Sequence, residues 1–477
     1  MTLINAETDA QPEDARDARA LLEKAGLASD EVNAWLSAVP ELRDDFSSDT
    51  AVCSSWWTLG ERLRAKLPKR AARDRNAAAA SDLIHNKERD LRERFLRSHI
   101  ETLYDKLTAS RSKFLRVEEL MPAAAALVPG LTPAAEAMTR EMPRPLKEKE
   151  HLEMDHSILL SHVLAHPEAG HHLCHAMLLP RTETVDLLPR LARDGSIDLG
   201  TACINRVGKA SIVELRNPKA LNALDETTLV PLETAVDLAI LDPGTEIAVL
   251  RGGRVEHRKY AGRRIFAAGI NLTHLYEGKI SFLFYFQHVM GYENKILRGV
   301  ARREGPLDDE ACSTIEKPWI AAVDSFAIGG GCQHLLVMDY VIAEAGAYLT
   351  LPARKEGIIP GMANLRLPRF VGDRVARQAI MYGRRIECDS PVGRLICDEI
   401  ASADRMDAAL AEAVAGLTSS GVVSAVGNRR QFRIGQEPLD VFRRYLALYA
   451  REQACCHFGD GLIANLELHW NAQSRKV

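Results

Sequence analysis

Two glycine-containing segments carry the residues that are best placed to do chemistry. The first is FAIGGGCQHLL, from Phe326 to Leu336, where an apolar run ends at Ile328 and an apolar helix is expected from about Cys332. The first N–H groups of a helix have no partner inside it, so glycines 329–331 could present bare donors to a negative group. Taken alone, these glycines fit a tight strand-to-helix turn equally well. The segment has neither the GxGxxG pattern nor the lysine of a phosphate-binding loop.

A second segment makes the first more informative. RRIFAAGINLTHLYEG, from Arg263 to Gly278, again places small residues and a glycine at the end of an expected strand, just before a helix. Two such places in one domain can supply two converging N–H groups. That is the minimum equipment of an oxyanion hole, which stabilises negative charge on a carbonyl oxygen.

Three motifs together resemble the crotonase superfamily of enoyl-CoA hydratases and isomerases. NPKALNAL (Asn217 to Leu224), FAAGINL and AIGGGCQ occur in the order and at the spacing of that family. The resemblance implies an α/β fold, a crotonase-like spiral of βαβ units, with CoA-thioester substrates and assembly into a homotrimer or homohexamer. It implies that the oxyanion N–H groups come from Ile270 and Gly330, with Gly331 as the neighbouring alternative.

Two positions depart from the hydratase pattern. The residue after GGGC, a catalytic glutamate in hydratases, is Gln333, and the second glutamate position, in LPARKEGIIPG, is Ala353. An amide and a methyl group cannot transfer protons, so hydration by the usual pair is not expected. What remains is an oxyanion hole without its acid–base pair, and no residue is assigned as the general base.

One branch of the superfamily is more similar than the rest, namely the cofactor-independent dioxygenases that act on 3,5-dihydroxyphenylacetyl-CoA in antibiotic biosynthesis. The likeness includes a long helical N-terminal domain, YAGRRIFAAGINLTHL, LPARKEGIIPG and YAREQACCHF. It implies oxidation of this or a closely related arylacetyl-CoA by O2 to an arylglyoxylate and CoA, without metal or flavin. Two N–H donors would stabilise the thioester enolate, and removing one such donor typically costs about 100- to 1000-fold in rate.

The resemblance also implies how the substrates are held. Leu272, Ala353 and Ile358 would line an apolar pocket for O2, although ordinary core packing explains them as well. Gln333 would bind the aryl ring, whereas Leu224 and His288 replace an acidic residue and an arginine of the family, so the ring substituents remain open. HRKYAGRR would contact the CoA phosphates, although a short charge run is usually solvated surface. The substrate contacts implied by the resemblance are Leu224, His257, Arg258, Lys259, Tyr260, Ala268, Gly269, Asn271, Leu272, His288, Gly357, Ile358 and Ile359.

A histidine-rich stretch and an aromatic run offer other interpretations. HLEMDHSILLSHVLAHPEAGHHLCH, His151 to His175, contains seven of the fifteen histidines, with His162 and His166 at the spacing of a helical metal site. HExxH is absent and Pro167 and Gly170 are expected to break the helix, so no metal is predicted. ISFLFYFQHVMGY, which runs from 280 to 292, could be core, an aryl pocket or a subunit contact.

Three domains are expected to position these residues: a helical domain 1–195, a crotonase-like α/β domain 196–400 and a helical region 401–477. In the first, helices are predicted at 81–107, starting with a serine, and 152–179, with a Pro/Gly connector at 121–133. In the second, two strands flank Gly208 within 202–215, a helix starts at Asp225, and strands cover 246–253 and 319–328.

Composition limits the class of protein. The chain has 477 residues, 46% hydrophobic and 26% charged, with a formal net charge of −4, so neither nucleic acid nor a membrane surface is an expected partner. The N-terminus is acidic, unlike a signal peptide, and no apolar run reaches membrane-spanning length. A cytoplasmic location with reduced thiols is therefore expected for the nine scattered cysteines, which are Cys53, Cys174, Cys203, Cys312, Cys332, Cys388, Cys397, Cys455 and Cys456.

Three other functions stay open. The first is a different crotonase reaction, such as isomerisation or thioester hydrolysis, and the second is non-catalytic binding of a CoA ester. The third is a metalloenzyme built on the histidine-rich stretch. Oxygen dependence, turnover and metal content separate them.

Overall fold

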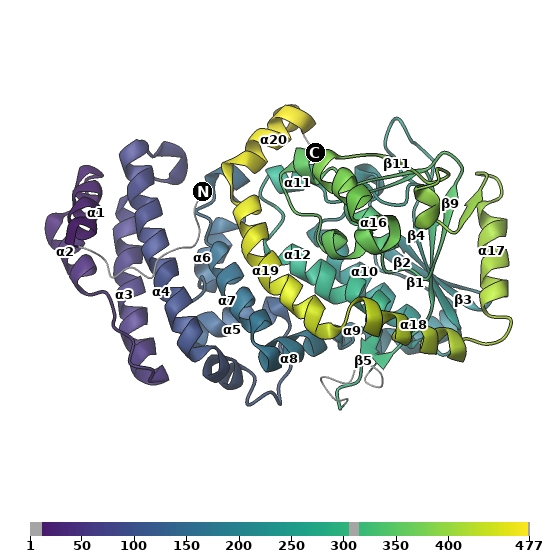
Figure 1. The fold of residues 1–477 in the computed structure, drawn as a ribbon, viewed down its shortest axis with the longest axis horizontal. Helices are drawn as coiled ribbons and strands as arrows, with labels where there is room; N and C mark the ends of the chain where they lie inside the picture. The colour runs from purple at the N-terminus through teal and green to yellow at the C-terminus, as the bar shows by residue number, and fades with distance from the viewer. Residues whose placement is uncertain (1–11, 305–313, 476–477) are drawn as a thin grey trace.

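The computed structural model describes residues 12–304 and 314–475; Cys312, one of the predicted thiols, lies outside them. Helices alone precede the first strand (Figure 1). They are α1 (Pro12–Lys24), α2 (Ser29–Ser37), α3 (Phe46–Lys66), α4 (Arg75–Leu107), α5 (Val117–Leu127), α6 (Ala135–Glu141), α7 (Met154–Ala165), α8 (Pro167–Leu178) and α9 (Thr182–Asp194).

The helical region differs from the sequence prediction in three places. Helix α4 starts six residues before Ser81, because the Asp74 side chain accepts a hydrogen bond from the Ala77 N–H and caps it. The expected connector begins inside α5, which contains Pro122. The Glu119 carboxylate accepts a hydrogen bond from the Arg116 backbone N–H at 2.9 Å, and this contact and an alanine-rich, half-buried sequence offset the hydrogen bond that proline removes. Pro167 does separate α7 from α8, but Gly170 lies within α8, where its missing side chain leaves room for Arg443.

A seven-stranded sheet forms the centre of the α/β region, in the order β1-β2-β3-β4-β7-β9-β12. The first three strands pair antiparallel and the rest pair parallel. Every residue of β4 is buried, as expected for a parallel strand covered on both faces. The strands are β1 (Ser196–Asp198), β2 (Ala202–Val207), β3 (Ala210–Leu215), β4 (Ile247–Gly252), β7 (Trp319–Val323), β9 (Tyr340–Glu344) and β12 (Glu399–Ala401).

A small second sheet carries the second glycine segment. The predicted single strand 319–328 is wrong, because the chain turns at Asp324 and Ser325 (φ 63°) and splits into β7 of the large sheet and β8 (Phe326–Ile328). Strand β8 pairs parallel with β10 (Tyr348–Thr350), which pairs antiparallel with β11 (Ile386–Glu387). A two-stranded ladder joins β5 (Val300–Ala301) to β6 (Thr314–Ile315).

The helices of the α/β region begin where the sequence patterns place them. Asp225 caps α10 through a capping box with Thr228, and the hairpin turn between β2 and β3 uses Gly208 at φ 57°. The remaining helices are α10 (Glu226–Leu241), α11 (Leu272–Tyr276), α12 (Leu283–Phe286), the π-helical turn η4 (Gln287–Tyr292), α13 (Glu293–Arg298), α14 (Gly330–Leu335), α15 (Ala353–Glu356), α16 (Ala363–Tyr382), α17 (Met406–Leu417), α18 (Val423–Gln436), α19 (Leu439–His457) and α20 (Asp460–Trp470).

Helix α19 joins the two halves of the molecule. It crosses from the α/β region to the N-terminal helices and packs on α7 and α8 (Figure 1). One continuous apolar core accordingly includes Trp35 and Phe95 of the helical region, Ala321 of β7 and Phe442 of α19. The α/β fold with a helical N-terminal region is confirmed, whereas the proposed domain limits stay a prediction. No helix in the described part of the chain is long and apolar enough to cross a membrane.

Candidate active site

The two glycine segments meet at a cavity of about 500 Å³, a volume that includes its open mouth. It lies between α12 and η4 on one side and the start of α14 and the α15 segment on the other. The residues that line it are Leu224, Ile270, Phe284, Tyr285, His288, Val289, Gly329, Gly330, Gln333, Leu351, Pro352, Ala353, Glu356, Ile358, Ile359, Pro360, Gly361 and Tyr449. Eight of the residues singled out in the sequence are among them: Leu224, Ile270, His288, Gly330, Gln333, Ala353, Ile358 and Ile359.

In the first segment, no hydrogen bond to a described residue uses the Ile270 N–H. Leu224 donates to the Gly269 carbonyl at 2.7 Å and accepts from the Asn271 N–H at 2.8 Å, so the backbone of Ile270 faces away from this bridge. Gly269 has φ 80°, and a Cβ there would lie only 2.9 Å from the Ile328 carbonyl oxygen. A glycine is therefore required to bring the two segments this close.

In the second segment, the Gly330 N–H likewise finds no acceptor among the residues that the structure describes. The Gly329 N–H donates to Thr350 O at 2.9 Å, and the Gln333 N–H donates to Gly329 O at 3.1 Å. Gly330 is the first residue of α14, so its N–H has no acceptor within the helix. Gly331 does not reach the cavity, because a Cβ there would lie 2.7 Å from that of Ala267.

The two positions that depart from the hydratases both border the cavity. The Gln333 side chain is 6% exposed, and its Oε1 is buried without a hydrogen-bond partner in the described structure. A Cβ on Gly361 would overlap this oxygen, so Gly361 makes room for the amide. Ala353 presents only a methyl group. The cavity therefore holds an amide and a methyl where the sequence alignment places the glutamates.

Other predicted contacts lie away from the cavity. Leu272 packs on the core beside it, and Gly357 lies against Asn465 and Leu462 of α20. Asn271 caps α11 and donates to Asp225 at 2.9 Å. Ala268 belongs to a small apolar cluster around Phe326.

The predicted CoA loop is a surface loop anchored at its end. His257, Arg258 and Lys259 are exposed, whereas Tyr260 packs on Phe326 with ring centroids 5.7 Å apart. Arg263 pairs with Glu344 at 3.4 Å. The loop is thus fixed to strand β8, beside the glycine segment, with three of its polar side chains in solvent.

Sequence reasoning missed two polar side chains of the cavity. No hydrogen bond or ion pair from the described residues reaches the carboxyl group of Glu356, and burial raises its pKa to about 7. Tyr449 of α19 brings a buried hydroxyl without a partner. Glu356 could have been found, since it directly precedes Gly357 in the LPARKEGIIPG segment. Tyr449 could not, because α19 reaches the cavity only through the tertiary fold.

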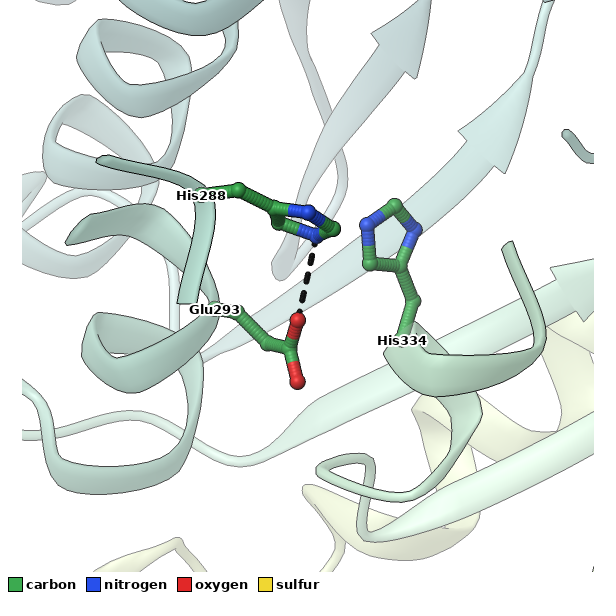
Figure 2. A group of neighbouring side chains, drawn as sticks. All are labelled: His288, Glu293 and His334. Atoms are coloured by element: carbon green, nitrogen blue, oxygen red, sulfur yellow. Dashed lines mark ion pairs between the residues drawn. The ribbon is translucent and has the colours of Figure 1, made fainter. Parts of the chain in front are cut away.

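A histidine pair and a carboxylate meet at one wall of the cavity (Figure 2). His288 Nε2 lies 3.1 Å from Glu293 Oε2, and the ligand-capable atoms of His288, Glu293 and His334 all lie within 4.8 Å of one another. Among the described residues, no other group of three or more histidine, cysteine, aspartate or glutamate side chains has its ligand-capable atoms this close together. The three side chains are 5%, 0% and 1% exposed.

The surroundings of this group suit proton transfer better than a metal ion. His334 Nε2 lies 3.0 Å from the Tyr292 hydroxyl, and its Nδ1 is buried without an acceptor. Metal-bound histidines normally have that second nitrogen hydrogen-bonded. The other oxygen of Glu293 binds the Arg366 guanidinium, which would repel a cation at this wall.

The histidine-rich stretch holds structural contacts. His162 pairs with Glu93 at 2.7 Å, and His166 caps α8. His172 lies between the Tyr104 hydroxyl and the Arg111 carbonyl, 2.9 Å from each. These three histidines contact different partners and do not converge on a common point.

The aromatic run serves both the core and the cavity. Ile280, Phe282 and Phe286 are fully buried, while Phe284 and Tyr285 line the cavity with His288. The wider π-helical turn, which often occurs at functional sites, places His288 and Val289 on the cavity side.

Comparison with known proteins places this geometry in a family. A family model described as Enoyl-CoA hydratase/isomerase matches residues 208–432. The (3,5-dihydroxyphenyl)acetyl-CoA 1,2-dioxygenase of Amycolatopsis orientalis is 43% identical over 407 residues, 85% of this chain and 92% of that protein. The crotonyl-CoA hydratase of Syntrophomonas wolfei is 31% identical over 38% of this chain and 61% of its own. An enoyl-CoA hydratase structure from Mycobacterium avium subsp. paratuberculosis covers 56% of this chain and 98% of its own, with 18% identity and a TM-score of 0.46.

The match to the Amycolatopsis protein is longer than the α/β region and C-terminal helices together, so it includes part of the N-terminal helices. A relative at this identity over nearly its whole length is evidence of common family membership. As the glycine motifs predict, the chain belongs to the enoyl-CoA hydratase/isomerase family, the crotonase superfamily.

Proposed function

We propose that the protein is a dioxygenase that oxidises an arylacetyl-CoA thioester, 3,5-dihydroxyphenylacetyl-CoA or a close analogue, to the arylglyoxylate and free CoA. The cavity carries this proposal: the unused N–H groups of Ile270 and Gly330 border it, while the hydratase glutamate positions hold Gln333 and Ala353. The identity to the Amycolatopsis dioxygenase supports the same reaction.

The reaction proceeds through an enolate, so it depends on stabilising negative charge on the carbonyl oxygen and does not require the two hydratase glutamates. Removal of an α-proton moves the C–H electron pair into the thioester, and the negative charge collects on the carbonyl oxygen between the two donors. The electron-rich α-carbon then reduces O2 and binds it. The overall change is ArCH2COSCoA + O2 → ArCOCOO⁻ + HSCoA + H⁺, in which both oxygen atoms enter the product and no other oxidant is consumed.

Oxygen would be held by the apolar wall. Ala353 and Ile358 line the cavity, whereas Leu272 is not among its lining residues and packs against the core. A methyl group in place of a glutamate leaves space and removes a charge, which favours an apolar gas over water. The protein itself would supply no metal or flavin to this step.

The aryl ring would lie among Leu224, Phe284 and Tyr285, with Gln333 and Tyr449 as hydrogen-bonding groups for ring substituents. Leu224 is apolar where the family resemblance expects an acid, so a less hydroxylated ring is accommodated on that side. The CoA phosphates would meet Arg258 and Lys259 on the exposed loop.

We also propose a cytoplasmic homotrimer or homohexamer. CoA thioesters and the eight free cysteines of the described residues fit a reducing compartment. Exposed apolar side chains on α18, among them Phe432 at 65%, offer a subunit contact. Light scattering during gel filtration measures the assembly.

The test is O2 uptake and thiol release by chelator-treated protein with phenylacetyl-CoA and 3,5-dihydroxyphenylacetyl-CoA. The proposal expects equimolar O2 uptake and thiol release, both atoms of ¹⁸O2 in the acid, and no reaction without oxygen. Loss of turnover with chelator, restored by metal, would contradict the cofactor-free reaction.

Glu356 favours a second candidate, a thioester hydrolase or isomerase. A cavity carboxyl with a pKa of about 7 is suited to general acid–base catalysis at neutral pH. Thiol release under nitrogen identifies the hydrolase, and a shifted double bond in an enoyl-CoA identifies the isomerase.

A further inference from the structure

We propose that His288 is the general base that removes the α-proton of the thioester, and that Glu293 positions it. This inference rests on the proposed function, and it fills a role that the missing glutamates leave empty. Three features support this role: the position of the His288 imidazole, the nitrogen of that ring that is free, and the contacts that hold the Glu293 carboxylate.

His288 lies beside an oxyanion donor. A Cβ built on Gly330 would be 3.4 Å from His288 Cε1, and both residues line the cavity. A thioester oxygen bound by the Gly330 N–H places the α-carbon two bonds away, close to the edge of this ring. Geometry of this kind is the first requirement for a general base.

The free nitrogen of the ring is Nδ1. Nε2 is the buried nitrogen and lies 3.1 Å from Glu293 Oε2, at ion-pair distance but not aligned as a hydrogen bond. No hydrogen bond from the described residues reaches Nδ1, and His288 lines the cavity. The neighbouring carboxylate favours a proton on Nε2, and a neutral histidine protonated there has its lone pair on Nδ1. His288 can therefore accept a proton at Nδ1 from the cavity.

Glu293 is held as a carboxylate. Burial alone would raise its pKa, but the Arg366 guanidinium and the nearby His288 imidazole outweigh burial and hold the pKa below its usual value. Arg366, 1% exposed, also binds Glu437 at 2.9 Å, so it is fixed from behind. The carboxylate thus orients the imidazole and stabilises the imidazolium that proton transfer creates.

His334 completes the wall without competing for the proton. Its ring lies edge-on to His288 at 5.4 Å, and burial, followed by the nearby His288, lowers its pKa to about 3. Its Nε2 contacts the Tyr292 hydroxyl. The positive charge formed in the reaction therefore stays on His288, next to Glu293.

The step balances without another reagent. The α C–H bond breaks, its electron pair forms the enolate, and the proton moves to Nδ1. O2 bonds to the α-carbon as a peroxide, whose outer oxygen attacks the thioester carbon and expels the CoA thiolate. The thiolate takes the first proton from Nδ1, so the neutral base can accept the second α-proton as the O–O bond breaks and the keto and carboxylate groups form. That second proton then passes to solvent.

Glu356 is the rival base, since its carboxyl also borders the cavity without a partner. The two can be separated by proton removal alone, measured without oxygen. Phenylacetyl-CoA is incubated with each variant in D2O under nitrogen, and deuterium at the α-carbon is followed by mass spectrometry, with the Kd measured in parallel.

We expect His288→Gln to lower the exchange rate by about 100-fold or more, with Kd changed less than about threefold. Glu293→Gln should lower exchange about 10- to 100-fold at unchanged Kd, and Glu293→Asp should recover part of it, which a purely structural role would not produce. His99→Gln, the matched control, removes an equally buried, carboxylate-paired imidazole outside the cavity.

Several outcomes overturn the inference. Wild-type exchange in folded His288→Gln removes the role of His288, and loss of exchange in Glu356→Gln alone transfers that role to Glu356. If His288→Gln does not fold, His288→Ala is measured with and without added imidazole instead. The inference is also contradicted if imidazole does not restore exchange in His288→Ala and Glu293→Gln exchanges as fast as the wild type. Exchange without O2 uptake in the wild type contradicts the proposed dioxygenase but not the base.

Discussion

Two buried histidines in this protein each lie at ion-pair distance from a carboxylate, in different surroundings. His99 lies 2.7 Å from Asp49 in the helical region, and His288 lies 3.1 Å from Glu293 beside the cavity. The ring of His99 is covered by Phe46 and Phe95, with centroids 5.7 and 4.9 Å away. The ring of His288 instead has an edge on the cavity.

The carboxylates are also held differently. Asp49 accepts the Arg43 backbone N–H at 2.9 Å, whereas Glu293 is held by a buried Arg366–Glu437 network. A histidine–carboxylate contact therefore does not by itself indicate catalysis. Access of the second ring nitrogen to substrate makes the difference, and each pair should respond to a different measurement.

Breaking the support of the cavity pair should give the largest effect. Arg366→Met leaves Glu293 and Glu437 without their shared cation, and removing one partner of a buried ion network costs about 3–5 kcal/mol. The free energy of unfolding from urea denaturation measures this loss. A change below about 1 kcal/mol would mean that the carboxylates are satisfied by other groups.

The oxyanion side of the cavity can be tested at one backbone atom. Gly330 is the first residue of α14 and has no positive φ, so Gly330→Pro deletes the N–H at a position that helices tolerate. Gly330→Ala adds a Cβ near Leu224 but keeps the N–H. O2-dependent thiol release should be about 100- to 1000-fold slower in the proline variant than in the alanine variant. Equal rates would show that this donor is not used.

The helical-region pair should affect stability alone. His99→Gln leaves Asp49 with one fewer buried hydrogen bond, and the expected loss is about 1–3 kcal/mol of unfolding free energy. Thiol release per folded molecule should equal that of the wild type. A fall in turnover without a change in stability would break the distinction between the two pairs.

A pH dependence of stability is expected from Glu356. Its pKa is about 7 when folded and near 4.5 when unfolded, so between these values the folded chain binds more protons. Stability from this group is therefore present below pH 4.5 and is lost as the pH rises to 7. Glu356→Gln should gain stability relative to the wild type across this window, levelling off above pH 7, by thermal denaturation. A pH-independent difference would contradict the raised pKa.

Local patterns predicted most of the secondary structure around the site. The capped helix after Asp225, the hairpin at Gly208 and the strand before Gly253 follow from short-range turn, cap and alternation signals. The secondary-structure predictions failed where tertiary contacts outweighed a local sequence rule. Pro122 stays inside α5, and the apolar run 319–328 divides between two sheets at Ser325, because neither packing nor sheet membership is encoded in a run of apolar residues.

Some residues of the candidate site could likewise be predicted from the sequence, and others could be found only in the structure. The family resemblance of the glycine motifs predicted that Ile270 and Gly330 face one site, and both residues line the cavity. The distinction between cavity-lining Gly330 and packed Gly331 needed the structure. So did the contribution of Tyr449, which is 119 positions after Gly330 in the sequence.

By itself, then, the sequence determined the family and the α/β fold and predicted the two backbone donors, because all three follow from motif residues at fixed local spacing. Only the tertiary structure decided which histidines matter. His288 meets Glu293 through a π-helical turn, and Glu293 meets Arg366 across 73 positions, whereas the histidine-rich stretch packs into helical contacts. Long-range packing sets the direction of each ring and what its free nitrogen faces, and no local pattern encodes that.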